Sequence, residues 1–206
     1  MDWTSLYFKS SDLNVFILGT GEVATRRADR FLTHGANVRL AGNHLDEDLK
    51  NKGAALYSTD KADELVEWAD LVIVASGDEE LANHICDISR DKLINRADFP
   101  EKGNIIVPTT FEIGDIEISI FTNGKSPLMA KQLRKKIQSI ITERDILEIE
   151  IQSYARSILK EAVDDQKRRR DYLYEILDDE NLAEYLENDE IDRAKEYVAD
   201  FIKGIQ

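Results

Sequence analysis

The chain has 206 residues, 42% of them apolar, which is enough for one substantial domain with an appendage. Its formal net charge of −14 argues against a general role on nucleic acids or membrane surfaces, because these polyanions would repel it. One cysteine excludes an internal disulfide, and three scattered histidines offer no zinc-type cluster. No apolar run is long enough to span a bilayer. We therefore expect a soluble cytoplasmic protein without a metal site and without nucleic-acid or membrane partners.

The first hundred residues alternate strand-like and helix-like segments. Short apolar runs predict buried strands at Asn14–Leu18, Asn37–Ala41, Ala55–Tyr57, Leu71–Ala75 and Leu93–Asn95. Apolar residues at helical spacing predict helices at Glu22–His34, Ala62–Trp68 and Glu79–Arg90. This alternation predicts an α/β fold, a Rossmann-type parallel sheet with helices on both faces. We assign it to a dinucleotide-binding domain over residues 1–109.

The pattern changes after residue 100. Asn104–Val107 and Ile116–Phe121 are strand-like, and Gly114 and Asp115 between them suit a hairpin turn. Leu128–Ile141 has helical spacing, and the chain from Glu143 onward is charged and helix-forming. We therefore predict a small α+β region over residues 110–144, followed by a helical C-terminal domain over residues 145–206.

The stretch "GTGEVA" fits the strand–turn–helix pattern of dinucleotide-binding proteins. Gly19 permits the tight turn, and Gly21 lets the backbone approach a pyrophosphate. The start of the following helix offers free N–H groups to the phosphates. The residues predicted to bind the cofactor here are Gly19, Thr20, Gly21, Glu22 and Val23. The alternative is a tight strand–helix turn that binds no ligand.

The acidic residue that usually binds the adenosine ribose, about 20 residues after the turn, is missing. Asn43 and His44 stand near that position and could bond the ribose. Arg39 or Arg26 could instead take a 2′-phosphate, so these residues leave NAD and NADP open.

A second wall of the cofactor site is predicted at Ala75, Ser76 and Asp78, because ligands bind at the carboxyl ends of such strands. For Ser76 and Asp78 the alternative is a helix N-cap with an early acidic residue.

Three blocks of the sequence resemble the precorrin-2 dehydrogenase family, which includes the N-terminal half of bacterial siroheme synthase. The first is "LYFKSSDLNVFILGTGEVATRRADRFLTHGANVRL". The second is "INRADFPEKGNIIVPTTFEIGDIEISIFTNGKSPLMAKQLRKKI". It contains the family's Asn-x-x-Asp, its apolar strand ending in proline and its Gly-x-Ser-Pro, at Asn95, Asp98, Pro108, Gly124, Ser126 and Pro127. The looser third block is "RRRDYLYEILDDENLAEYLENDE". The chain departs from the family pattern at Thr20, where a glycine is common, and at Arg27, where a lysine is common.

The resemblance implies an NAD-dependent enzyme that oxidises precorrin-2, a tetrapyrrole, to sirohydrochlorin. It also implies a homodimer, and a catalytic role for the aspartate that maps onto Asp98. Some members of the family also insert iron into sirohydrochlorin, so a bifunctional enzyme is one alternative. A non-enzymatic module that binds a nucleotide or a tetrapyrrole is another.

The residues themselves are consistent with this chemistry. Asp98 follows the fifth predicted strand, where a carboxylate could accept a proton while hydride leaves the substrate; the alternative is an ordinary turn aspartate before Phe99. No acidic residue occurs from Asn123 to Thr142, so a basic helix there could attract a polycarboxylate. The alternative is a solvated helix that pairs with the acidic tail. The predicted substrate-binding residues are Asn95, Thr122, Asn123, Gly124, Ser126, Lys131 and Arg134.

A second basic patch, "QKRRRD", runs from Gln166 to Asp171. It either approaches the active cleft of a partner subunit or pairs with the acidic residues around it.

Overall fold

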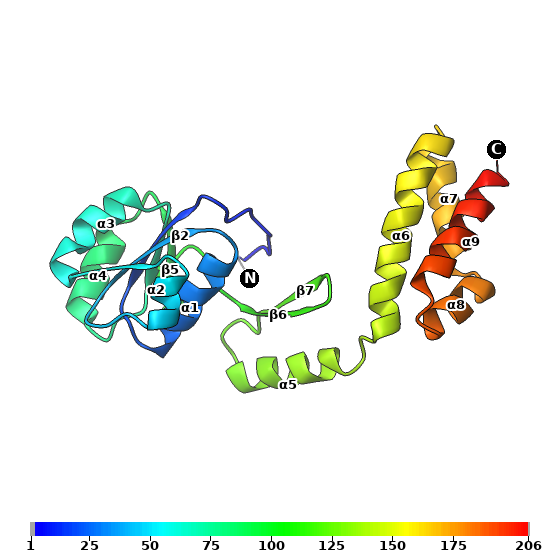
Figure 1. Cartoon of the computed structure of the whole chain (residues 1–206). Helices are drawn as coiled ribbons and strands as arrows, with labels where there is room; N and C mark the ends of the chain where they lie inside the picture. Colours follow the sequence, from blue (N-terminus) through cyan, green and yellow to red (C-terminus); the bar gives the residue numbers. More distant parts are fainter. Residues whose placement is uncertain (1–2, 206) are drawn as a thin grey trace. The chain divides into compact units, whose positions relative to one another are not determined.

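The computed structural model describes residues 3–205, which fold as two compact units (Figure 1). The first unit ends at Val107 and the second begins at Pro108. Each unit has its own buried apolar core.

The first unit is built on a five-stranded parallel sheet in the order β3-β2-β1-β4-β5. The strands are β1 (Asn14–Leu18), β2 (Asn37–Ala41), β3 (Ala55–Tyr57), β4 (Leu71–Val74) and β5 (Leu93–Arg96). The chain reverses its direction of winding between β1 and β4, which creates a topological switch point. All carboxyl ends lie at one edge, with Leu18 opposite both Ala41 and Val74.

Helices cover both faces of this sheet (Figure 1). α1 (Glu22–Thr33) and α2 (Glu47–Asn51) pack on the face that carries Val15 and Ile17. α3 (Ala62–Trp68) and α4 (Glu79–Ile88) pack on the face that carries Phe16 and Leu18. Because both faces are covered, β1 and β4 are apolar along nearly their whole length. The predicted Rossmann-type architecture is confirmed. Two short 3₁₀ turns, Thr59–Lys61 and Pro100–Lys102, complete the unit.

One predicted strand is wrong. Asn104–Val107 forms no strand, and the next strand begins at Thr109. The side chain of Asn104 bonds the backbone of Lys92 and Ile94 beside β5, while Ile105 and Val107 pack against the core under β1 and β2. Residues 104–107 therefore form a crossing segment, whose apolar side chains are half-buried against the sheet although it is not a strand.

The second unit begins with an antiparallel hairpin of β6 (Thr109–Ile113) and β7 (Ile116–Ile120). Gly114 has the positive φ of +54° that this turn requires. α5 (Pro127–Gln138) packs beside both strands. It ends three residues earlier than predicted because Thr142 and Asp145 form a reciprocal capping box that starts the next helix.

Four helices complete the second unit (Figure 1). They are α6 (Glu143–Ala162), α7 (Gln166–Leu177), α8 (Glu180–Glu187) and α9 (Ile191–Lys203). Their apolar faces meet in a core that includes Ile151, Leu159 and Ile202. No helix in residues 3–205 has both the length and the apolar character needed to cross a membrane.

Candidate active site

Three loops are held together at the carboxyl edge of the parallel sheet. The backbone N–H of Gly19 donates to the Ala41 carbonyl at 2.9 Å, and that of Ala75 donates to the Leu18 carbonyl at 2.9 Å. Ala97 donates to the Val74 carbonyl, also at 2.9 Å. The structure therefore brings the glycine turn, the loop after β4 and the loop after β5 to one edge of the sheet.

The glycine turn has the shape of a phosphate cradle. Gly19 has a φ of +113°, and a Cβ placed on it would lie 2.3 Å from the Ala75 carbonyl oxygen. A Cβ on Gly21 would meet no atom within 4 Å, so open space lies above this residue. α1 begins directly afterwards, and no side chain caps it. Its first N–H groups therefore suit a pyrophosphate, and the residues present fit a dinucleotide.

Thr20 does not occupy that open space. A Cβ on Gly42 would lie 2.5 Å from the Thr20 Cγ2 atom and 2.9 Å from its Oγ1 atom. The Thr20 side chain is therefore directed at the end of β2. Of the other predicted residues at this turn, Glu22 is exposed and pairs with Arg26 at 3.5 Å, and Val23 is half-buried.

The loop after β2 exposes Asn43 and His44, neither of which bonds another described side chain. The two arginines considered for a 2′-phosphate are engaged elsewhere. The Arg39 guanidinium lies 3.9 Å from the centre of the Trp68 ring and 5.5 Å from that of Tyr57. Arg26 forms the exposed ion pair with Glu22. Arg39 therefore makes cation–π contacts on the sheet face opposite the one that α1 covers.

The loop after β4 uses its polar residues to start α4. Asp78 accepts a hydrogen bond from the Leu81 N–H at 3.1 Å, and Ser76 Oγ accepts one from the Asp78 N–H at 3.1 Å. The N-cap interpretation of Asp78 is therefore confirmed. Contact of Ala75, Ser76 and Asp78 with the cofactor stays a prediction.

Asp98 is bound by a buried arginine that sequence reasoning missed. Arg96 Nε donates to Asp98 Oδ1 at 2.7 Å, and Arg96 Nη2 donates to Oδ2 at 3.0 Å. The Arg96 side chain is fully buried, whereas the Asp98 side chain is 40% exposed. The hydrogen bonds from Arg96 hold the pKa of Asp98 below its usual range. Asp98 is therefore an ionised, oriented carboxylate that still reaches solvent.

The remaining contacts of Arg96 fix its guanidinium. Its Nη1 atom donates to Asn83 Oδ1 at 2.9 Å and to the Cys86 sulfur at 3.8 Å. The guanidinium also lies 5.5 Å from the centre of the Phe99 ring. The hydrogen bond to Asp98 raises the pKa of Arg96, which stays charged. The only local sequence signal was an arginine two residues before the aspartate, in "NRAD".

Asn95 is placed differently from the prediction. Its side chain is almost completely buried, at 2% exposure, and its Nδ2 donates to the Ile105 carbonyl at 3.0 Å. Its Oδ1 atom is buried without a hydrogen-bond partner. Asn95 therefore anchors the crossing segment against β5 and does not present its side chain at the surface.

The other predicted substrate residues lie in the second unit. Ser126 caps α5 by accepting from the Met129 N–H at 3.1 Å, and Thr122 Oγ1 bonds the backbone of Ser126. Between them, Asn123 and Gly124 both have positive φ, 54° and 70°. This compact turn leads into the basic helix. On α5, Lys131 is exposed, and the Arg134 guanidinium lies 5.3 Å from the centre of the Phe111 ring.

Residues 3–205 contain no group of three or more His, Cys, Asp or Glu side chains arranged to hold a metal ion.

The parallel sheet, the glycine cradle and the uncapped helix start define a Rossmann-type protein with a dinucleotide site. The family model described as "Putative NAD(P)-binding" matches residues 6–109.

Named relatives specify the family. The chain is 31% identical to a protein named "Putative precorrin-2 dehydrogenase" from Methanocaldococcus jannaschii, over 84% of this chain and 88% of that protein. It is 30% identical to a precorrin-2 dehydrogenase from Methanosarcina barkeri, over 84% of this chain and 81% of that protein. The chain belongs to the precorrin-2 dehydrogenase family. The solved structure of SirC, a precorrin-2 dehydrogenase, has the same fold, with a TM-score of 0.77 and 22% identity over 95% of this chain and 100% of SirC.

Proposed function

We propose that this chain catalyses the NAD-dependent oxidation of precorrin-2 to sirohydrochlorin. The observation that carries the proposal is the meeting, at one sheet edge, of an open glycine cradle with the carboxylate that Arg96 orients. The glycine cradle suits the pyrophosphate of the cofactor, and the carboxylate of Asp98 can act as the proton acceptor. The names of the relatives supply the substrate.

Each residue at the edge has a proposed task. The backbone at Gly21 and the start of α1 hold the pyrophosphate, while Asn43 and His44 bond the adenosine ribose. The nicotinamide ring, when bound, supplies the hydride acceptor. Asp98 accepts a proton from the tetrapyrrole as hydride leaves. Because its pKa is lowered, Asp98 is a weak base, and it acts on a hydrogen that becomes acidic only as the substrate is oxidised.

The surroundings of β2 support the proposal of NAD rather than NADP. An NADP site needs a cation for the 2′-phosphate, and the Arg39 guanidinium lies over the rings of Trp68 and Tyr57. Arg26 faces the competing carboxylate of Glu22. The exposed side chains of Asn43 and His44 suit hydrogen bonds to ribose hydroxyls.

The second unit is proposed to supply substrate contacts and the dimer interface. Thr122, Asn123, Gly124 and Ser126 shape the turn that leads into α5, and the exposed Lys131 and Arg134 on that helix suit a polycarboxylate.

The hairpin and α5, within the region proposed for dimerisation at residues 110–144, expose unusual apolar surface. Leu128 is 67% exposed and Met129 is 50% exposed. A two-stranded hairpin is marginal alone, and within residues 3–205 no third strand pairs with either of its edges. A second copy of the chain would cover both features. The helical domain proposed for residues 145–206 follows this region.

The decisive experiment is anaerobic incubation of the full chain with NAD and freshly generated precorrin-2, followed by the absorbance of sirohydrochlorin. Asp98→Asn should reduce turnover at least about a hundredfold while NADH binding is kept. Asp87→Asn is the matched control, because Asp87 also pairs with an arginine, Arg90, at 2.7 Å on an exposed surface. Absence of NAD-dependent turnover by the wild type would reject the function, and a fully active Asp98→Asn would reject the site.

A further inference from the structure

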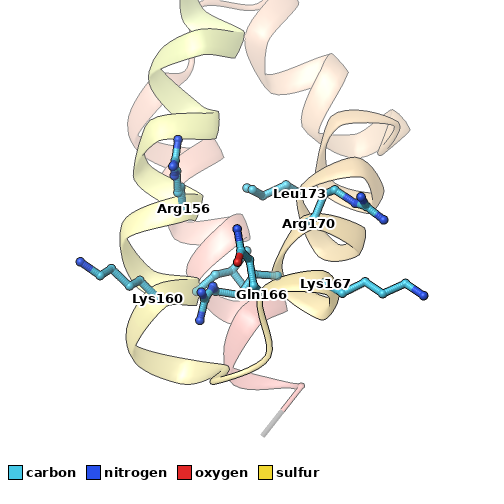
Figure 2. A pocket seen from close by; sticks show the side chains of 8 residues that line it. Arg156, Lys160, Gln166, Lys167, Arg170 and Leu173 are labelled. Carbon is cyan, nitrogen blue, oxygen red and sulfur yellow. The ribbon is translucent and has the colours of Figure 1, made fainter.

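A pocket of about 700 Å³ lies in the helical part of the second unit, between α6 and α7 (Figure 2). Five of its eight lining residues are cationic and none is acidic. The cations are Arg156 and Lys160 on α6, and Lys167, Arg169 and Arg170 on α7. On a chain with a net charge of −14, this is a concentrated reversal of charge.

Helical spacing explains why these residues line one pocket. Arg156 and Lys160 are four residues apart, so they share one face of α6. Gln166, Arg170 and Leu173 follow one another at spacings of four and three residues, so they share one face of α7. In Figure 2, Gln166 and Leu173 lie between the two helices and Arg156 lies against α6, while Lys160 and Lys167 extend to opposite sides. The buried Leu159 and the half-buried Leu173 add an apolar lining between the charges.

Three of the five charges have no partner within residues 3–205. Arg156, Lys160 and Lys167 form no hydrogen bond or ion pair with any described residue. Arg169 is fixed in place, because its Nη1 atom donates to the carbonyls of Val163 and Asp164 at 2.7 and 2.9 Å.

Arg170 has only a long, exposed contact of 3.6 Å with Asp171. Like charges gathered in one pocket repel one another, and a bound anion removes that cost.

We propose that this pocket is a binding site for a polycarboxylate small molecule, of the tetrapyrrole class on which the proposed function acts. That the ligand is a tetrapyrrole rests on the proposed function. That the ligand is an anion rests on the pocket alone. Pockets of about 300–1,000 Å³ typically hold organic ligands, whereas a lone phosphate needs far less space. Carboxylates around the rim of a macrocycle match cations spread over two helices, and its hydrocarbon parts match the half-buried Leu173.

The test is a fluorescence titration of the full chain with uroporphyrin, an octacarboxylate porphyrin that needs no turnover and no NAD. The pocket variant is Arg156→Gln with Lys160→Gln. The control variant is Arg193→Gln with Lys203→Gln, which removes the same charge from α9, where both residues are exposed and pair with acids three residues earlier. At fixed ionic strength the pocket variant should bind at least about tenfold more weakly, and the control should match the wild type.

Backbone amide NMR shifts locate the bound porphyrin. Gln166 and Leu173 should shift in the wild type and not in the pocket variant. Equal affinity of the wild type and the pocket variant would overturn the inference, as would shifts confined to residues 3–107. Displacement by inorganic pyrophosphate at the same concentration as the porphyrin would overturn the polycarboxylate assignment. The pocket variant could instead lose self-association while it still binds porphyrin. That result would show that the pocket binds an acidic segment of a second copy of the chain, and it would overturn the inference.

The porphyrin-binding test of the pocket is independent of the turnover assay that tests the proposed function. Turnover of precorrin-2 together with unchanged porphyrin binding by the pocket variant would keep the proposed function and reject the pocket. Porphyrin binding in the pocket without NAD-dependent turnover would keep the pocket and reject the enzyme.

Discussion

Thr20 and Gly42 are complementary across the first two strands: the Thr20 side chain fills the place where a Cβ on Gly42 would stand. The Thr20 Cγ2 atom lies 2.5 Å from that point. Gly42 has no positive φ, so the backbone itself would accept another residue there. The threonine in the glycine turn and the glycine after β2 therefore depend on each other, although 21 other residues separate them in the sequence.

Gly42→Ala is expected to force the Thr20 side chain out of this position, towards the cofactor cradle. We expect a loss of about 1–3 kcal/mol in stability, the usual cost of overpacking, and weaker NADH binding. Thr20→Gly in the same chain should restore both, because it removes the colliding atoms. Thermal unfolding and NADH fluorescence titration of the single and double variants measure this. Additive losses in the double variant would contradict the proposed dependence.

Arg96→Gln should move the pH dependence of the reaction. Arg96 lowers the pKa of Asp98, so the ionised base persists to lower pH in the wild type. Without the guanidinium the pKa of Asp98 rises, and the acid limb of kcat/KM should shift to higher pH. The same lowered pKa means that the contribution of Asp98 to stability is present above its unfolded pKa and is lost as pH falls through its folded pKa.

The matched control for Arg96→Gln is Arg90→Gln, which breaks an exposed arginine–aspartate pair on the same unit. Its pH profile should coincide with that of the wild type. An unchanged acid limb in Arg96→Gln, with turnover retained, would show that Asp98 is not the group that titrates.

Asn43→Asp should sharpen the preference for NAD. It restores the carboxylate that usually bonds the adenosine ribose, and it would repel a 2′-phosphate. We expect the ratio of kcat/KM for NAD over NADP to rise by about tenfold or more, mainly through a higher KM for NADP. Asp46→Asn is a useful comparison, since Asp46 lies nearby in the sequence and caps α2. A wild-type enzyme that already prefers NADP would contradict the cofactor proposed here.

The sequence predicted those parts of the fold that depend on local pattern. β1, β2 and β3 begin and end at the predicted residues, because each is a short apolar run bounded by turn residues. The strand predicted at Asn104–Val107 is absent because its apolar residues are half-buried against the sheet in a segment that forms no strand. The Arg96–Asp98 pair could not be predicted, since it depends on an arginine being buried at the end of a strand. The turn that joins Thr122 to Ser126 could not be predicted either, because it depends on positive φ angles at the two residues after Thr122.

Arg27 offers a test of stability near the cofactor turn. Its Nη1 atom is buried without a hydrogen-bond partner. Burial first, then Arg26 and Arg30, lower its pKa to about 10. Because the folded pKa lies below the unfolded one, the charged form costs stability at every pH below about 10, and the cost is relieved as pH rises through that value.

Arg27→Met should therefore raise the stability by about 1 kcal/mol, since a flexible apolar side chain replaces a cation that lacks a partner. For a chain of this length, that corresponds to an increase in Tm of about 2–4 °C in a thermal unfolding scan at neutral pH. Arg26→Met is the control, because Arg26 is exposed and its pair with Glu22 is screened by solvent, so its Tm should change little. A lower Tm for Arg27→Met would contradict this prediction. It would mean that the packing of the Arg27 side chain stabilises the fold by more than the lack of a partner for Nη1 destabilises it.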